Sequence, residues 1–392
     1  MNVIVTDVRY RMSLPIIRSL GRVGARITAA DRITTPDKAA LGFYSKYTHA
    51  RAHLPSPENT DDFLSALCSL DVGERAALIP VGIDTLLTLC ANRKKVSESF
   101  DIALPPMESI ELANDKLSLM RYAKDQGVPC PATATLRDGE EISELAARVA
   151  YPAVIKYRAG ELLQLDPKDR YCIVKGPEEL IARYEKMHEL QEKPIVQEYV
   201  SGEGFGVSVV MDKQSNPLKL FCHRRIHEYP TSGGPSCLCE SAWNNELAEH
   251  AVKLLKSLNW HGVAMVEFKG TPSGGYKLME INPRIWGSVA LAPAAGCDIA
   301  SAIVASARGE LSAVSELSPD YRVGKRMRFL LQDILAFPSY LKSSKNKFAF
   351  ALKYMALLLD PRCADGVFKI YDPMPGIRYL IQAFKKKDKI IR

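Results

Sequence analysis

Two stretches of the sequence, Met265-Val266-Glu267-Phe268 and Met279-Glu280-Ile281-Asn282-Pro283-Arg284, decide how the rest of the chain is interpreted. Each places one acidic residue in an apolar run that is typical of a buried β-strand. The loop 270–275 contains three glycines, so we expect a hairpin with Glu267 and Glu280 side by side on one face. Two carboxylates placed that way repel each other, and a bound divalent cation would remove the repulsion.

The residues that follow Glu280 continue the same face of the strand. Residues two apart on a strand point the same way, so Asn282 and Arg284 are expected beside Glu280. Asn282 offers a neutral oxygen, which Mg²⁺ accepts together with carboxylates, phosphates and water. Arg284 offers a planar cation for a phosphate or a developing oxyanion. The alternative, two edge-strand acids in ordinary salt bridges, does not explain this shared face.

This Glu…Glu-x-Asn-Pro-Arg arrangement resembles the metal-binding end of the ATP-grasp superfamily, which includes carbamoyl-phosphate synthases, biotin carboxylases and amino-acid ligases. The resemblance extends over about residues 1–310 and implies an α/β fold with an α+β core. It implies ATP as nucleotide and Mg²⁺, or alternatively Mn²⁺, as metal, with two ions held by Glu267, Glu280 and Asn282. The expected parts are a Rossmann-like pre-ATP-grasp domain (1–112), a lid and small subdomain (113–200), the core with the metal site (201–320) and a basic C-terminal extension (321–392).

Two lysines fit the order of nucleotide-binding residues in that superfamily. Lys116, in Asn114-Asp115-Lys116, resembles the first nucleotide lysine, at the start of a helix. Lys156, at the end of the apolar run 153–156, resembles the second. Two ammonium groups suit the neutralisation of ATP phosphates as charge moves toward the leaving ADP.

The segment 194–200 resembles the hinge that holds adenine. The resemblance implies backbone contacts to the base around Glu198, Tyr199 and Val200, although a plain core strand would look the same. Glu203 is the nearest acid for the ribose hydroxyls, one place earlier than in many members of the superfamily.

Two further segments concern the phosphates and the acceptor. The stretch 157–164, where a glycine-rich flap often lies, has one glycine, and Arg158 is its nearest charge. The segment 222–234 resembles the one that runs into the acceptor pocket. It implies a catalytic role for Arg225, with Arg224 as the alternative, and offers His223 and His227 as bases or bystanders.

The bulk properties agree with a multi-domain globular chain. The 392 residues are 47% hydrophobic and 25% charged, and strand and helix signals alternate over the first hundred residues. The nine cysteines are scattered, which predicts ordinary reduced thiols. No basic and apolar leader precedes the first strand, so we expect a cytoplasmic protein. Asp31 could mimic a ribose-binding acid, but without a Gly-x-Gly-x-x-Gly turn a strand-end role is favoured.

The positive charge of the chain belongs to its C-terminal part. Residues 321–392 carry 16 Lys and Arg against 5 Asp and Glu, so the body is slightly acidic and we expect no nucleic-acid partner. The apolar run 348–359 is too short to span a bilayer and is expected to be a core helix. The alternative is a weak peripheral membrane contact, together with the lysines at 385–389.

The resemblance implies a carboxylate–amine ligase that uses ATP, forms an acyl phosphate and releases ADP and phosphate. Its partners would be small-molecule carboxylates and amines, and a homodimer is the default assembly. A bicarbonate-using carboxylase or carbamoyl-phosphate-type enzyme is the second hypothesis, weakened because we find no biotin-carrier Met-Lys-Met segment and no duplicated half. A non-catalytic nucleotide-binding regulator is the third.

Overall fold

The apolar runs at the start of the chain form a parallel sheet in the computed structural model, with the strand order β3-β2-β1-β4. Its strands are β1 (Asn2–Val5), β2 (Arg26–Arg32), β3 (Thr48–Leu54) and β4 (Ala77–Ile79). The helices of this region are α1 (Ser13–Arg22), α2 (Thr60–Cys68), α3 (Ile83–Ala91) and α4 (Arg93–Ser99). Parallel neighbouring strands need crossover connections, and helices such as α1, between β1 and β2, provide them. The predicted Rossmann-like beginning is therefore confirmed.

The structure describes residues 1–385 except 37–38, 74, 161–162, 164, 166–168, 232–233, 311–313 and 315. The chain divides into two units. Unit 1 contains Met1–Met107, Val207–Met265 and Pro283–Arg392, and unit 2 contains Glu108–Gly206 and Val266–Asn282. The four-part division expected from the sequence remains a prediction.

Asp31, at the end of β2, is held by neighbouring protein groups. Its carboxylate accepts hydrogen bonds from the backbone N–H of Arg9 (2.5 Å) and Arg32 (2.7 Å) and from the Thr35 hydroxyl (2.9 Å). It also pairs with the Arg9 guanidinium at 2.6 Å. These contacts fit the strand-end role favoured from the sequence.

A seven-stranded sheet, with the order β13-β12-β9-β10-β11-β14-β15, continues the chain. Its strands are β9 (Gly204–Met211), β10 (Pro217–Glu228), β11 (Ser236–Ala242), β12 (Gly262–Gly270), β13 (Tyr276–Asn282), β14 (Arg326–Arg328) and β15 (Ala364–Asp365). The helices between them include α9 (Asn245–Ser257), α10 (Leu291–Ala295) and α11 (Ile299–Arg308). The hairpin of β12 and β13 predicted around Glu267 and Glu280 is therefore present as two neighbouring strands.

The three chain segments of unit 1 share one hydrophobic core. Ile17 comes from the first segment, Phe221 from the second, and Trp286, Phe329 and Tyr379 from the third, and all are buried in the same cluster. A core built from such distant segments makes the C-terminal extension a structural part of unit 1.

A buried ion pair fixes the extension to the first helix. Arg18, in α1, donates from Nε to Asp372 Oδ2 at 2.8 Å, and both side chains are less than 5% exposed. Asp372 also accepts from the Ser45 hydroxyl and the Lys46 backbone N–H, each at 2.9 Å. These bonds satisfy a carboxylate that would otherwise be costly to bury.

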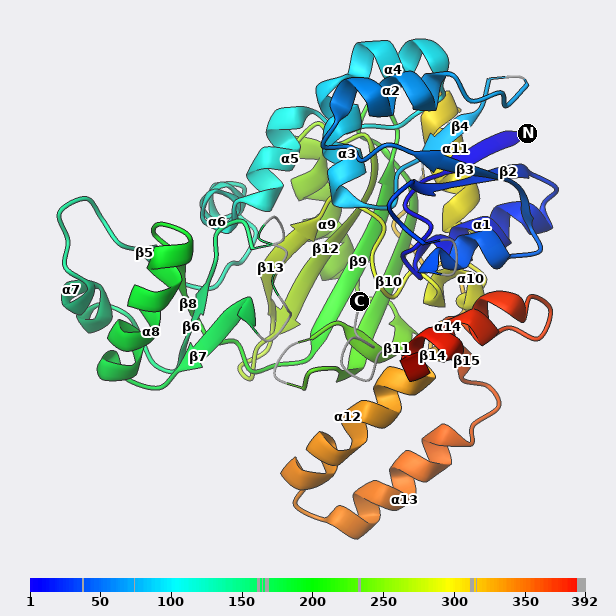
Figure 1. The fold of residues 1–392 in the computed structure, drawn as a ribbon. Coiled ribbons are helices and arrows are strands. Elements are labelled where there is room, and N and C mark those ends of the chain that lie inside the picture. The colour runs from blue at the N-terminus through cyan, green and yellow to red at the C-terminus, as the bar shows by residue number, and fades with distance from the viewer. Residues whose placement is uncertain are drawn as a thin grey trace. The chain divides into compact units, whose positions relative to one another are not determined.

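The extension also forms a helical hairpin and a last helix. These are α12 (Leu330–Ser343), α13 (Lys347–Leu358) and α14 (Met374–Lys385), and Figure 1 shows α12 and α13 as an antiparallel pair. The expected core helix at 348–359 is wrong in its burial, because Tyr354 is the one buried residue of α13. The run is apolar except for Lys353, and the face that carries Phe350 and Tyr354 meets α12.

Unit 2 is built on a second, antiparallel sheet with the order β5-β8-β6-β7. Its strands are β5 (Thr133–Thr135), β6 (Ala153–Lys156), β7 (Tyr171–Val174) and β8 (Ile195–Glu198). Its helices are α5 (Met107–Asn114), α6 (Lys116–Asp125), α7 (Ile142–Ala147) and α8 (Pro177–Leu190). Leu145, Ile155 and Tyr184 are fully buried between this sheet and its helices. Among the described residues, we find no helix with the length and hydrophobicity needed to cross a membrane.

We predict that Asp372→Ala lowers the free energy of unfolding by about 3–5 kcal/mol, because it leaves the buried Arg18 guanidinium uncompensated. Urea titration measures the change. The control is Asp320→Ala, which removes the partner of Lys219 at an exposed position and should cost less than about 1 kcal/mol. An Arg18→Met/Asp372→Ala double variant should lose less than the sum of its single changes, and strict additivity would contradict the pairing.

Candidate functional site

Lys116 is fixed at the first turn of α6 by the residue before it. Asp115 is the N-cap of that helix and accepts from the backbone N–H of Leu117 (2.9 Å) and Ser118 (3.0 Å). The Arg158 guanidinium forms an ion pair with the same carboxylate. Burial acts to raise the pKa of Asp115, but the hydrogen bonds from Arg158 and the two amides outweigh it and lower that pKa.

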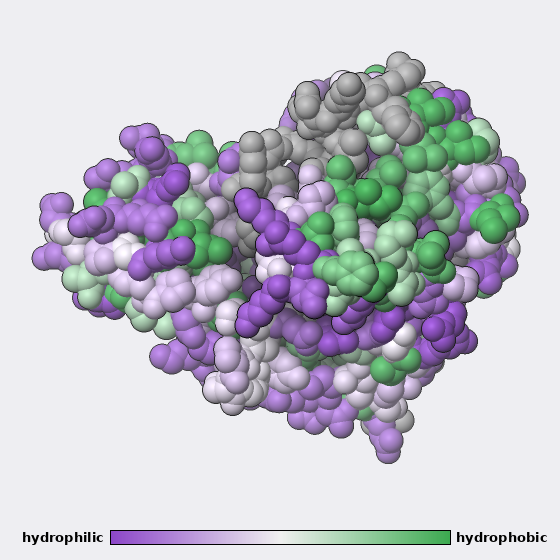
Figure 2. All heavy atoms as spheres, turned by 90° about the horizontal axis from the view of Figure 1, so that it is seen from below, coloured by the Kyte–Doolittle hydropathy of each residue, from purple (hydrophilic) through white to green (hydrophobic). Residues whose placement is uncertain are grey.

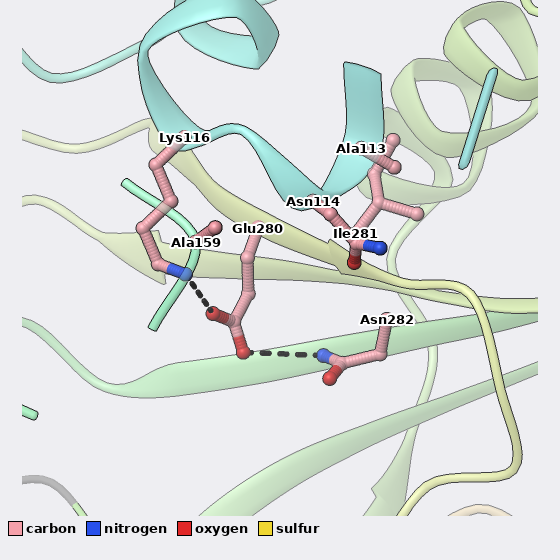
Figure 3. Close-up of a pocket in the computed structure, with 7 residues that line it drawn as sticks. All are labelled: Ala113, Asn114, Lys116, Ala159, Glu280, Ile281 and Asn282. Atoms are coloured by element: carbon pink, nitrogen blue, oxygen red, sulfur yellow. Dashed lines mark hydrogen bonds and ion pairs between the residues drawn. The ribbon is translucent and has the colours of Figure 1, made fainter. Parts of the chain in front are cut away.

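Lys116 faces Glu280 across a pocket that lies within unit 2 (Figure 3). Its Nζ lies 3.7 Å from Glu280 Oε2, and Asn282 Nδ2 donates to Glu280 Oε1 at 3.2 Å. Strand β13 delivers Glu280 and Asn282 to the same side, as the two-residue spacing predicts. Figure 3 shows the Glu280 carboxylate between the lysine and the amide. The pocket thus joins two predicted metal ligands to one predicted nucleotide lysine.

Lys156, at the end of β6, is half-buried in the same charge cluster. Its Nζ donates to the Gln197 side chain at 2.7 Å. Burial lowers the pKa of Lys156 to about 8; nearby Lys116 lowers it further, and the carboxylates of Glu280 and Glu267 oppose the shift. Lys116, Glu267 and Glu280, which the sequence predicts for the same site, therefore lie close enough to Lys156 to shift its pKa.

The chemistry of the donor set fits a hard divalent cation. Glu267, half-buried on β12, and Glu280 supply carboxylate oxygens from neighbouring strands. Asn282 can turn its amide oxygen toward the same point, since its amide already lies against Glu280. Within the described ranges no group of three His, Cys, Asp or Glu side chains gathers, so this set depends on the amide as third donor.

The hinge residues are placed together, but two of their amides are already engaged. The Glu198 N–H donates to the Ala132 carbonyl at 2.8 Å and the Tyr199 N–H to the Pro152 carbonyl at 3.3 Å. The Val200 carbonyl accepts from Lys269 Nζ at 3.3 Å. A base held at this segment would have to use backbone groups other than these two amides.

The segment after the hinge lies against the end of β12. Gly202 approaches Gly270 so closely that an added Cβ would lie 1.7 Å from the Gly270 carbonyl oxygen. The Glu203 carbonyl accepts from the Gly270 N–H at 2.9 Å, and the Glu203 side chain is exposed. Only glycine permits this approach at 202.

The two predicted catalytic arginines belong to unit 1, unlike the nine nucleotide and metal candidates. Arg225, on β10, pairs with Glu228 at 3.3 Å. Arg284 Nη1 donates to the Ile285 carbonyl at 3.1 Å. The alternative residue, Arg224, pairs with Glu240 of β11 at 2.9 Å.

The two histidines of the predicted acceptor segment are both buried. His223 Nε2 lies 3.0 Å from the Ser288 hydroxyl. His227 Nδ1 lies 2.8 Å from Asp333 Oδ1, and its ring lies near those of Tyr340 and Tyr354. His227 is therefore part of the packing beneath α12 and α13 and does not fit a solvent-facing base. Ser232 and Gly233 of this segment, and most of 161–168 in the flap region, lie outside the described residues.

Three residues that support the site were missed by the sequence analysis. Gln197 accepts from Lys156, Lys277 pairs with the Glu198 carboxylate at 2.6 Å, and Asp115 holds both α6 and Arg158. The N-cap role of Asp115 could have been anticipated, because Asp before a helix start is a strong capping signal. The other two depend on strand register, which the sequence leaves open.

Solved structures with this architecture define the fold as ATP-grasp. Biotin carboxylase from Campylobacter jejuni matches with a TM-score of 0.65 at 17% identity, covering 83% of this chain and 74% of that one. The L-amino acid ligase from Bacillus licheniformis matches with a TM-score of 0.56 at 14% identity, covering 80% and 77%.

The sequence comparisons place an ATP-grasp domain in the chain. Residues 191–328 match the family described as "ATP-grasp in the biosynthetic pathway with Ter operon". The carbamoyl phosphate synthase large chain of Pyrococcus furiosus is 25% identical over 230 residues, which are 55% of this chain. The matched region spans about a fifth of that relative's length, 21%. The resemblance stated from the sequence is thereby confirmed.

We predict that the stability of the protein rises with pH relative to a Lys156→Met variant. Lys156 has a pKa near 8 in the folded state and 10.5 as its ordinary value, so folding expels a proton between those values and raising the pH favours it. Between pH 7.5 and 9.5 the parent should gain about 2 kcal/mol over the variant in urea titrations.

The matched control is Lys186→Met, at an exposed position on α8. Its difference from the parent should be independent of pH over the same interval. A flat difference for Lys156→Met as well would contradict the lowered pKa of Lys156.

Proposed function

We propose that the protein is an ATP-dependent carboxylate–amine ligase that binds Mg·ATP in unit 2. The observation that carries the proposal is the grouping of Lys116, Glu280 and Asn282 around one pocket, with Lys156 coupled to the same charges. Two cations beside two carboxylates and an amide supply separate partners for a polyphosphate and for its metal.

Glu267, Glu280 and Asn282 would hold Mg²⁺, or Mn²⁺ in its place, and two ions are proposed for this set. When bound, the metal supplies positive charge to the phosphate oxygens. The segment from Glu198 to Val200 would hold the base, and Glu203 the ribose. A structural neighbour supports this choice of ligands: the Hydrogenobacter thermophilus biotin carboxylase domain is described in complex with MgADP and bicarbonate.

The proposed reaction uses the charges that this chain supplies. A substrate carboxylate oxygen forms a bond to the γ-phosphorus as the bond to the ADP oxygen breaks, and Lys116 and Lys156 stabilise the leaving charge. An amine then attacks the acyl carbon, the amide bond forms, and phosphate leaves with the acyl oxygen. Arg284 and Arg225 are proposed to stabilise the tetrahedral oxyanion. Closure that excludes water would protect the acyl phosphate.

A bicarbonate-using reaction is the second candidate. It is favoured by the names of the relatives, which include carbamoyl phosphate synthase and the small subunit of 2-oxoglutarate carboxylase. The L-amino acid ligase among the structural neighbours favours the first. A homodimer is also proposed, following the dimer described for the Hydrogenobacter thermophilus domain.

We predict that one carboxylate–amine pair raises ADP release from Mg·ATP and that Glu280→Gln lowers the stimulated rate by on the order of 100-fold. The substitution keeps the shape of the side chain and removes its charge. Coupled detection of ADP across a panel of carboxylates, with and without amines, makes the measurement. Glu185→Ala, at an exposed position on α8, is the control and should release ADP as the parent does.

The outcomes separate the candidate functions. Stimulation by bicarbonate alone would assign the second reaction. If nothing stimulates, and the parent binds Mg·ATP no more tightly than Glu280→Gln, the ligase proposal fails and a non-catalytic regulator remains.

A further inference from the structure

The hairpin of α12 and α13 is held to unit 1 by one face. Tyr340 of α12 and Tyr354 of α13 lie 4.6 and 5.9 Å, ring to ring, from His227. Phe337 lies 4.5 Å from Tyr354, and the Tyr340 hydroxyl accepts from the Glu228 backbone N–H at 2.8 Å. This aromatic cluster holds the hairpin to unit 1 and partly buries the face of the hairpin that carries Phe337, Tyr340 and Tyr354.

The outer face of α13 is an exposed apolar stripe. Phe348, Leu352, Met355 and Leu359 follow one another at spacings of four, three and four residues, which places them along one side of the helix. They are exposed by 75, 57, 49 and 74%. Large apolar side chains gathered in this way mark an interaction surface.

The charged side chains between Asp333 and Asp360 are all lysines. Between Asp333 and Asp360 the sequence contains Lys342, Lys345, Lys347 and Lys353 and no acidic residue. All four lysines are exposed. Figure 2 shows hydrophobic surface on the underside of the molecule, where Figure 1 places the hairpin, with hydrophilic side chains beside it.

We propose that this hairpin face docks on an anionic lipid surface, with the α13 stripe in the interfacial layer and the lysines on the headgroups. An apolar stripe with lysines beside it is the pattern of an interfacial helix, because lysine stems cover apolar surface while their ammonium groups reach the phosphates. At roughly 18 Å for its 12 residues, α13 is too short to cross a hydrocarbon core of about 30 Å. The proposed helix therefore lies in the plane of the membrane interface.

The charge pattern favours lipid over a second copy of the chain. Pairing two α13 stripes would bring the lysines of one copy near those of the other, and the one acid of the hairpin, Asp333, is buried and paired with His227. An anionic membrane satisfies the apolar stripe and the lysines together. The side chains of the basic run 385–389 lie outside the part of the chain that the structure describes.

The test is flotation of the full chain with phosphatidylcholine vesicles that contain or lack phosphatidylserine, at low and high salt. The parent should float with the anionic vesicles at low salt and lose binding at high salt. Phe348→Ser/Leu352→Ser should lower the partition coefficient by more than about ten-fold. Lys345→Gln/Lys347→Gln should lower it by roughly five-fold for each lysine.

Two comparisons make the result decisive. Ile33→Ser, which removes a side chain 62% exposed at the other end of the sequence, should bind as the parent does. A parent that ignores phosphatidylserine, or a Phe348→Ser/Leu352→Ser variant that still floats, would overturn the proposal. A dimer in sedimentation equilibrium that Leu352→Ser dissociates, without vesicle binding, would assign the stripe to a second copy instead.

Discussion

The partly desolvated ammonium group of Lys156 is the constraint on which the charge arrangement of unit 2 depends. A lysine partly removed from water needs partners, and here the Gln197 side-chain oxygen accepts a hydrogen bond from it while Glu280 and Glu267 offset its charge. Lys116 would make the cluster too positive without the same two glutamates, one of which it approaches at 3.7 Å. Each group therefore limits where the others can lie, and the result is a pocket poised for ligands that carry both signs of charge.

The support of this cluster comes from backbone geometry as much as from charge. Asp115 ends the preceding turn, begins α6 and holds Arg158, so the position of Lys116 is set by a helix cap. The close approach of Gly202 to Gly270 brings the end of the hinge against β12. These local features explain why residues far apart in the sequence converge within one unit.

The sequence was sufficient where a local periodicity determines which way side chains point or how strands are connected. The parity of Glu280 and Asn282 on a strand predicted their shared face, and the alternation of strands and helices predicted the parallel sheet at the N-terminus. It was insufficient where the answer depends on a distant partner. Nothing local indicates that Arg18 meets Asp372, that Lys277 meets Glu198, or that His227 is buried beneath Tyr340 and Tyr354.

The helix at 347–358 shows that composition alone is also insufficient to predict burial. Its composition predicts burial, and the aromatic face of Phe350 and Tyr354 is indeed packed against α12. Hydrophobicity specifies that a surface avoids water, without specifying what covers it. The expectation of a core helix failed because the second face of α13 is exposed in the part of unit 1 that the structure describes.

The joining of the first helix to the C-terminal extension has a consequence for how the chain acquires its structure during synthesis. The carboxylate that neutralises Arg18 is added more than three hundred residues after it, and Tyr379 of the shared core comes later still. On a ribosome the first sheet can assemble early. The core that its segment shares with the C-terminal extension stays partly exposed until the extension has been synthesised. Unit 1 is therefore completed last although it contains the first residues, and unit 2, whose two segments end at Asn282, can mature before it.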